Sequence, residues 1–418
     1  MLESGTQLRW STSFEVSYPD FPSFDLKPRS IRLAQERGQQ DVLTIVYPVY
    51  SQVYMDALKT GVTVKVTWSN EKGNGSWYGY VYHTNPVTNR GLDRPFIVKC
   101  IGASLSLKDK GAKIWRNKFS SDIVTEICNQ FNLKPKVTPS KVVFAQQSLY
   151  SQTYWEKIQE LAVRNGYVAQ LFGTELHFHP LDQMIDQAMG SIPVLEFKEV
   201  IGDPNSVIDG ATLDYFELKS GDFSDNEGTS KRIKTISGVD PLTGKPFGST
   251  QSPSTAGRPL RSDKRAALFA ENMHSVIATD KAMAEALAIG AAQLGRYTHF
   301  GKGLAQGNLN IGPYKTVEIK GINPQSDGYW VVTKVTHLVD HLGQASSEFE
   351  CMSDGTSPTN SDAFRTADNT QVPIRNLNYE IVNQVVSKPT ETTLQATTLV
   401  VSQSDGGFVT TPRRWVGM

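Results

Sequence analysis

The segment Glu175–Pro180, E-L-H-F-H-P, carries the residue types best suited to chemistry in this sequence. Alternate positions of a strand point to the same side, so the side chains of Glu175, His177 and His179 would share one face. Imidazole and carboxylate groups bind zinc, but a zinc site needs a third or fourth ligand, and no other His or Cys lies nearby in the sequence. We therefore favour a histidine pair on the solvent side of a hairpin and predict no metal site.

Other motifs with chemical potential are incomplete. Asp222–Gly228 (D-F-S-D-N-E-G) lacks the ligand spacing of a calcium-binding loop. Gly301–Gly307 (G-K-G-L-A-Q-G) is not a G-x-G-x-x-G phosphate loop, and it follows a predicted helix instead of opening one. The sequence has no G-x-S-x-G, no H-E-x-x-H and no Cys within a family signature. We predict no catalytic, cofactor-binding or metal-binding residues, no cofactor, and a protein that is not an enzyme.

Composition excludes several classes of protein. The 418 residues contain 42 basic and 42 acidic side chains, so no net charge draws the chain to nucleic acid or to an anionic membrane. Cys100, Cys128 and Cys351 are far apart, which supports neither a disulfide framework nor a zinc site, and Cys128 fits a helix core. No run of eighteen apolar residues and no signal peptide is present. We expect a soluble chain made in a cytoplasm, with no membrane partner.

Two basic segments could contact partners. The cluster Arg258, Arg261, Lys264 and Arg265 has one aromatic residue near it, so a solvated or interface loop is favoured over nucleic-acid binding. Near the C-terminus, the candidate partner contacts are Arg413, Arg414 and Trp415, because Arg and Trp are enriched in binding hot spots. A frayed tail remains the alternative for this second segment.

Residues 1–105 are predicted to form strands separated by Gly, Pro and Asn. In Gly61–Asn70 the alternation places Val62, Val64, Val66 and Trp68 on one face, and Ser51–Leu58 is predicted to be a short helix beside the sheet. Closing such a sheet into a barrel would protect its edges. The strand-rich runs are Thr6–Val16, Ser30–Glu36, Asp41–Pro48, Gly61–Asn70, Gly75–Thr84 and Pro95–Ser104.

Residues 106–203 change to helix–strand units. Thr153 and Glu156 have the spacing of a capping box, and Gly166 suits the left-handed residue after a helix. Tyr167–Phe172 and Glu175–His179 are then predicted to pair around Gly173 and Thr174. The apolar stripe of the helix is predicted to consist of Trp155, Ile158, Leu161 and Ala162, with Leu176 and Phe178 facing it.

Residues 204–355 return to strands, with one helix that Asp280 caps and Gly295 ends. Residues 356–418 are rich in Ser, Thr, Asn, Gln and Pro and are predicted to be an extended arm that orders on a partner. The predicted fold class is α+β, mainly β: two small tube-type antiparallel β-barrel domains (1–105 and 204–355), separated by a helix–strand domain (106–203), with the arm at the end. Val62–Thr84 and Lys315–Leu338 share a strand–turn–aromatic–histidine order, which suggests a duplicated barrel.

This order of parts resembles the late control protein D family, the baseplate hub proteins of tailed phages, over about residues 1–355. The helix–hairpin element is matched by Thr153, Trp155, Leu161-Ala162 and Gly166-Tyr167. The final barrel of the family is matched by Gly312–Gly321 (G-P-Y-K-T-V-E-I-K-G), Asp327–His337 (D-G-Y-W-V-V-T-K-V-T-H) and Ser346–Met352. Each motif is loose, and the resemblance rests on their order.

The resemblance implies a structural virion protein, a homotrimeric baseplate hub without catalysis. Six barrels would continue the six-fold tail tube and form part of the channel for DNA, which passes without specific binding. Implied partners are the tail tube protein, a separate central spike protein, other baseplate proteins and the tape measure protein. The implied location is the virion tail baseplate, assembled in the host cytoplasm. Two alternatives stay open: a type VI-like secretion hub, and a cell-wall-binding or hydrolase-associated tail protein that uses the middle domain.

Overall fold

The computed structural model describes residues 11–353 and 379–381, with gaps at 23, 25, 50, 72, 88–94, 142, 188–191, 199–211, 221–232, 241–242, 254–269, 273–277, 279, 296, 298 and 323–325. Several predictions therefore lie outside the described residues. These are the Asp222–Gly228 turn, the basic cluster of residues 258–265, the partner contacts Arg413–Trp415, and all of the arm except 379–381.

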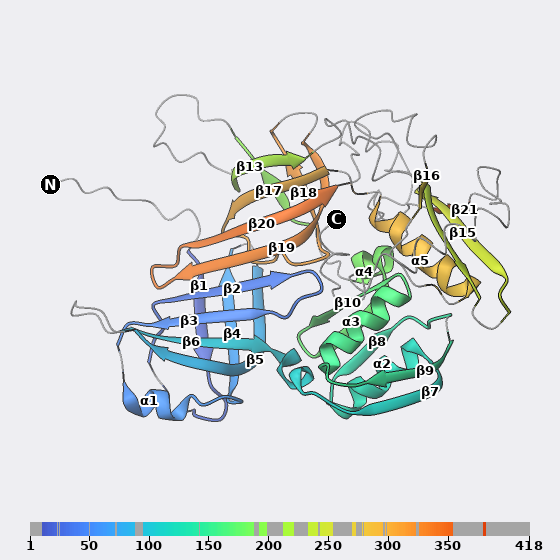
Figure 1. Cartoon of the computed structure of the whole chain (residues 1–418). Helices are drawn as coiled ribbons and strands as arrows, with labels where there is room; N and C mark the ends of the chain where they lie inside the picture. Colours follow the sequence, from blue (N-terminus) through green and yellow to red (C-terminus); the bar gives the residue numbers. More distant parts are fainter. Residues whose placement is uncertain are drawn as a thin grey trace.

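A twelve-stranded sheet forms the largest part of the molecule (Figure 1). Ten strands follow the order β1–β4–β5–β6–β3–β2–β19–β20–β17–β13, while β18 pairs with β19 and β12 pairs with β18. The chain is thus mainly β, as predicted. The strands are β1 (Ser13–Ser17), β2 (Ser30–Glu36), β3 (Val42–Tyr47), β4 (Thr63–Asn70), β5 (Gly73–Pro86), β6 (Phe96–Gly102), β12 (Val194–Glu196), β13 (Leu213–Ser220), β17 (His299–Gln306), β18 (Thr316–Lys320), β19 (Gly328–Asp340) and β20 (Ala345–Ser353).

The strands β2 and β19 join the two β-rich parts of the chain. They pair antiparallel along the whole of β2, from Ser30 opposite Asp340 to Glu36 opposite Lys334. The two parts that we predicted as small barrels are therefore connected through one continuous curled sheet. The pairs β4–β5 and β18–β19, which contain the suspected repeat, are both antiparallel. The domain boundaries and the duplication stay predictions.

The alternation within β4 has the predicted effect on packing. Val64 and Val66 are fully buried in the core of the first β-rich part, and Val62 and Trp68 pack against that core from partly buried positions. Burial of a Val side chain contributes roughly 1.5–3 kcal/mol, so this one face supplies much of the local stability. The short predicted helix is α1 (Gln52–Ala57), and no buried residue lies on it.

The middle of the chain forms helix–strand units around a separate core. Its two small sheets have the orders β10–β11–β8 and β7–β9. Cys128 is fully buried in this core, as predicted. The elements are the 3-10 helix η1 (Ala103–Lys108), β7 (Lys113–Phe119), α2 (Ser120–Gln130), β8 (Lys134–Val137), β9 (Val143–Leu149), α3 (Tyr154–Arg164), β10 (Tyr167–Phe172), β11 (Glu175–Pro180) and α4 (Leu181–Gln187).

The helix α3 has both termini that the sequence predicted. The Glu156 backbone N–H donates to Thr153 Oγ1 at 3.2 Å, and the Thr153 N–H donates to Glu156 Oε2 at 2.8 Å, which completes the capping box. At the other end, Gly166 has a φ of 64°. The hairpin β10–β11 follows, with Leu176 and Phe178 fully buried in the same core as the apolar stripe of α3.

Replacing Thr153 with alanine is expected to lower the free energy of unfolding by about 1 kcal/mol, because the first turn of α3 loses a capping acceptor. Urea denaturation followed by circular dichroism measures the change. Thr125→Ala is the control, since the Thr125 hydroxyl donates to the Ser121 carbonyl inside α2 and caps no terminus. Equal losses in the two variants would contradict a specific role for the cap.

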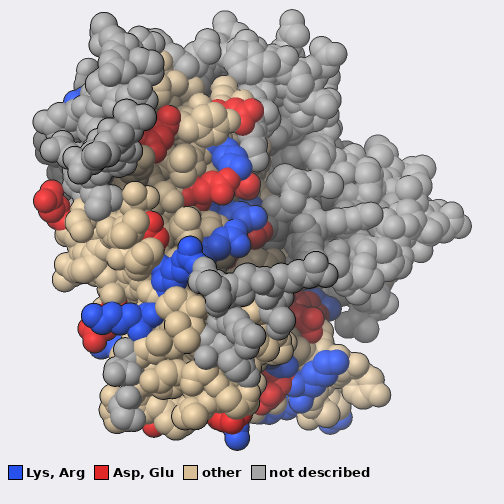
Figure 2. Space-filling view, turned by 90° about the vertical axis from the view of Figure 1, so that its left-hand side faces the viewer, with Lys and Arg blue, Asp and Glu red and all other residues tan. Residues whose placement is uncertain are grey.

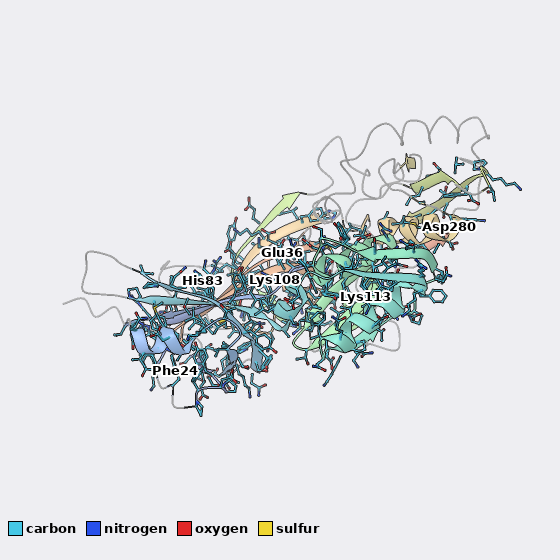
Figure 3. All side chains as sticks on the ribbon, turned by 60° about the horizontal axis from the view of Figure 1, so that its bottom comes forward. Phe24, Glu36, His83, Lys108, Lys113 and Asp280 are labelled. Carbon is cyan, nitrogen blue, oxygen red and sulfur yellow. The ribbon has the colours of Figure 1, made fainter. Side chains whose placement is uncertain are left out.

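A third unit packs on the middle part. The sheet β16–β14–β15–β21 is covered by α5, whose N-cap is Asp280 and which ends at Gly295, as predicted. Figure 3 shows Asp280 and Phe24 toward opposite ends of the molecule, with Glu36 and Lys108 between them. The elements are β14 (Ile233–Val239), β15 (Pro246–Pro253), β16 (Ala270–Asn272), β21 (Tyr379–Ile381) and α5 (Lys281–Leu294).

Two glycines make the close contact between α3 and α5. A Cβ atom on Gly290 would lie 2.5 Å from the Cα of Gly166, and a Cβ on Gly166 would collide with the carbonyl oxygen of Ala286. The backbones therefore touch at a point where no side chain fits. This contact ties the end of α3 to α5, and it explains the glycine within an otherwise alanine-rich helix.

Candidate functional site

The histidine pair occupies a position that the sequence did not predict. His177 and His179 are 6% and 5% exposed, so the prediction of a solvent-facing pair is wrong. They lie on the face of β11 opposite Leu176 and Phe178, where α4 packs on the hairpin. The predicted alternation of the two faces is correct. Both faces of this small sheet are covered, however, and alternation along a strand cannot tell whether a face is covered by another element.

The hydrogen bonds around His179 fix the tautomer of its imidazole ring. The Thr138 hydroxyl donates to Gln183 Oε1 at 2.6 Å, so at 2.7 Å from His179 Nδ1 it accepts from that nitrogen, and His179 Nε2 carries no proton. Within the described residues, His179 Nε2 and His177 Nδ1 have no hydrogen-bond partner. Burial lowers the pKa of both imidazoles, that of His179 to about 4, so both are neutral at pH 7.

Neutral histidines can bind a metal ion, but too few further metal-ligating side chains lie near this pair. The Glu175 carboxylate is 3.8 Å from His177 Nε2. No group of three or more His, Cys, Asp and Glu side chains suited to a metal ion occurs in the part of the chain that the structure describes.

We expect the double variant His177→Ala/His179→Ala to leave the metal content of the purified chain unchanged, as measured by inductively coupled plasma mass spectrometry. Because both imidazoles are buried, the same variant should unfold at a lower urea concentration. Loss of a stoichiometric metal ion in the variant would contradict this prediction and identify a metal site.

A second histidine forms a pair that resembles part of a hydrolase triad. His337 Nδ1 lies 2.7 Å from Ser347 Oγ, and His337 Nε2 lies 3.0 Å from the Ile311 carbonyl. Both side chains are buried, and Ser347 Oγ also lies 2.9 Å from the Asn308 carbonyl. Each polar atom is used to hold residues 308–311 against β19 and β20, so the arrangement is a structural anchor and offers no nucleophile to a substrate.

The glycine-rich motif at 301–307 also has a packing explanation. Its residues 301–306 lie in β17, whose backbone pairs with β13 and β20 on either side. A Cβ atom on Gly303 would lie 2.5 Å from the Phe349 ring, and one on Gly301 would collide with the Phe216 ring. These glycines make room for phenyl rings in the core.

The most regular arrangement of charged side chains is a ladder across five neighbouring strands. Directly opposite residues follow one another from β13 through β17, β20 and β19 to β2. Their signs alternate, and all five are exposed or half-buried. We call this row the charge ladder: Glu217, Lys302, Glu350, Lys334 and Glu36. At about 4.8 Å between strands it is roughly 19 Å long.

The cations of the charge ladder are paired by carboxylates from neighbouring strands. Lys334 Nζ lies 3.6 Å from Glu36 Oε2 across the β2–β19 junction, and Lys302 forms an ion pair with Glu348 on β20. The hydrogen bond from Lys302 lowers the pKa of the Glu348 carboxyl, and the same contact raises the pKa of Lys302. Figure 2 shows acidic and basic side chains interspersed along one side of the molecule. The result is a charged surface with almost no net charge.

Nothing in the linear sequence predicted the charge ladder. Its members come from residues 36 to 350, and only the strand register brings them into one row. A local signal existed in S-E-F-E, where Glu348 and Glu350 alternate with buried residues. That signal marks an exposed face, but it cannot identify the strands on either side.

The fold can now be compared with known structures. It superposes on a tail protein from Neisseria meningitidis MC58 with a TM-score of 0.56 and 11% identity, covering 83% of this chain and 97% of that chain. It superposes on the 43 kDa tail protein of prophage MuSo2 from Shewanella oneidensis with a TM-score of 0.54 and 12% identity, covering 83% and 99%. The chain has the fold of phage tail proteins.

The same fold extends to a secretion system. The Escherichia coli c3393 protein, a component of the type VI secretion system with structural similarity to the bacteriophage T4 tail proteins gp27 and gp5, gives a TM-score of 0.51. Its identity is 8%, and the superposition covers 83% of this chain and 78% of that chain. No family model and no curated protein matches the sequence.

The comparisons therefore support the resemblance that the order of motifs suggested, and they place this tail-protein fold among phage tail and type VI spike-like proteins. Within the described residues, no helix combines the length and the apolar character needed to cross a membrane.

Proposed function

We propose that the chain is a structural virion protein, the trimeric baseplate hub that connects the six-fold tail tube to a central three-fold spike. The observation that carries the proposal is the superposition on two phage tail proteins over almost their whole length. The continuous sheet agrees with it, because a hub acts through extended surfaces and needs no reactive centre. The proposed partners are further copies of this chain, the tail tube protein, the spike protein, other baseplate proteins and the tape measure protein.

In this proposal DNA crosses the hub through a channel that does not bind it specifically. The protein works in the virion tail baseplate after assembly in the host cytoplasm, and it has no enzymatic role. Residues 356–418 clasp the spike, with Arg413, Arg414 and Trp415 as contacts. Equal numbers of acidic and basic residues support passage without adhesion.

The oligomeric state tests the proposal. The purified full chain, examined by size-exclusion chromatography with light scattering and by electron microscopy, should form a ring of three copies with an open centre. A chain that stays monomeric at every concentration and in the assembled particle would contradict the hub function. Deleting residues 382–418, which follow β21, should leave the ring intact and abolish binding to the spike protein, which separates the two parts of the proposal.

A hub in a type VI-like secretion system is the second candidate, because the E. coli c3393 protein has the same fold. Both functions use a ring and a spike, so the oligomeric state does not separate them. The neighbouring genes do: tail tube, tape measure and terminase genes indicate a phage, whereas secretion ATPase and membrane-complex genes indicate a secretion system. Retention of the chain on purified peptidoglycan would instead support the wall-binding alternative.

A further inference from the structure

We propose that the sheet face bearing the charge ladder lines the DNA channel of the assembled hub, and that its paired charges prevent a polyanion from adhering. This inference rests on the proposed hub function. It assigns one particular face to the channel and gives that face a physical task.

The first argument comes from the composition of the face. Contacts between subunits are depleted of charged residues at their centre, and Lys and Glu are among the most depleted. On this face Lys and Glu occupy directly opposite positions of five strands. A face of this kind remains in water when the chain assembles, either on the outside of the ring or along the channel.

The second argument is that stability does not account for the ladder. Ion pairs between exposed side chains contribute between nothing and about 1 kcal/mol each. Lys334 and Glu36 are both 45% exposed, so their pair falls in this class. The alternation of charge is therefore better explained by contact with DNA in the channel than by a contribution to the stability of the fold.

The third argument concerns the properties of a channel wall. DNA binding strengthens with each cation that neutralises a phosphate, so unpaired Lys and Arg side chains would hold the duplex. Here Lys302 and Lys334 have carboxylate partners on neighbouring strands, and the five ladder residues carry one more negative than positive charge. Such a wall neither holds the polyanion nor presents a large single-sign field.

The position of the face is tested by labelling a cysteine in the assembled ring. Thr336 on β19 faces the same side, next to the ladder, and Thr336→Cys leaves every ladder residue in place. The matched control is Ser148→Cys on β9, an exposed position of the middle unit. Because Cys100, Cys128 and Cys351 are all buried, the introduced thiol reports alone.

Each variant ring is treated with N-ethylmaleimide, or with a biotin maleimide already bound to streptavidin, a protein wider than a DNA duplex. We expect Thr336→Cys to react with the small reagent but not with the large one, and Ser148→Cys to react with both. Equal reaction of both positions with the large reagent would place the ladder outside, and protection of Thr336→Cys from both reagents would place it between subunits. Either result overturns the inference while the hub function stands; absence of a ring overturns both.

The proposed role of the charge ladder in preventing adhesion of DNA is tested by removing carboxylates from this face. In the variant Glu36→Gln/Glu348→Gln/Glu350→Gln, Lys302 and Lys334 lose the carboxylates of their ion pairs, and Arg32 loses the nearby carboxylate of Glu348. The ring of this variant should bind duplex DNA at least tenfold more tightly than the wild-type ring at low salt. The slope of log K against log salt should be about −2.7 for three freed cations.

The control carries the same change in net charge at three glutamates outside the ladder: Glu15, Glu71 and Glu285. It should bind DNA as weakly as the wild type. Equal DNA binding by the two triple variants would show that net charge alone matters and would overturn the proposed role of the ladder.

Discussion

Replacing Gly166 with alanine is expected to lower the free energy of unfolding by about 2–5 kcal/mol. The left-handed φ of 64° costs an alanine about 1–2 kcal/mol. The new Cβ would also collide with the carbonyl oxygen of Ala286 on α5, and relief of such overpacking costs typically about 1–3 kcal/mol. The contact is between two backbones, so no side chain can rotate away. Urea denaturation monitored by tryptophan fluorescence measures the loss.

The matched control for this prediction is Gly173→Ala in the β10–β11 turn. Gly173 has a φ of 59°, but nothing lies within 4 Å of the point that its new Cβ would occupy, so the substitution carries the conformational cost without the collision. The difference between the two variants therefore measures the α3–α5 contact. If both lose the same stability, the close approach of Gly166 to α5 has no energetic weight.

The stability of the fold is expected to fall as the pH drops from 7 to 5. Burial lowers the pKa of His337 and of His179 to about 4, against 6.5 in the unfolded chain. Between these values the unfolded chain binds more protons, so the stabilisation is complete above pH 6.5 and is lost as the pH falls toward 4. Between pH 7 and pH 5 each histidine should remove about 2 kcal/mol, because the loss begins near pH 6.5 and proceeds at about 1.4 kcal/mol per pH unit.

Urea denaturation at pH 5, 6 and 7 measures this dependence. In His179→Asn an amide N–H lies near the position of Nδ1 and can still donate to Thr138, so this variant should reduce the pH slope by the contribution of one histidine. A free energy of unfolding that is constant from pH 7 to pH 5 would contradict buried, neutral histidines in the native state.

Local signals in the sequence were sufficient for many single elements. Ser30–Glu36 was predicted as a strand with the bounds that β2 has, and the capping box, Gly166 and Asp280 each have the predicted role. These features depend on a few neighbouring residues, so propensity and capping chemistry identify them. The strands β7 and β9 were missed, because most of their residues are exposed and neither segment has the strict alternation of a half-buried strand.

Tertiary features were beyond the same reasoning. The pairing of β2 with β19 and the rows of opposite residues along it depend on contacts across three hundred residues. The burial of His177 and His179 depends on α4, which covers a face that sequence alternation alone assigned to solvent. The candidate surface could not be predicted for this reason: each charged residue looks like an ordinary exposed position until the strands are ordered.

The junction between β2 and β19 has a consequence for synthesis of the chain. Until residues 334–340 have been synthesised, residues 30–36 lack their partner strand, and the open edge of β2 is free to pair with other strands. At about 5–20 residues per second, the ribosome needs roughly 15–60 s to make the intervening three hundred residues. Such distant pairing folds slowly, and the growing chain is exposed to aggregation during that interval. The first β-rich part thus has to remain soluble with an unfinished sheet, so chaperone demand should be greatest before residue 340 leaves the ribosome.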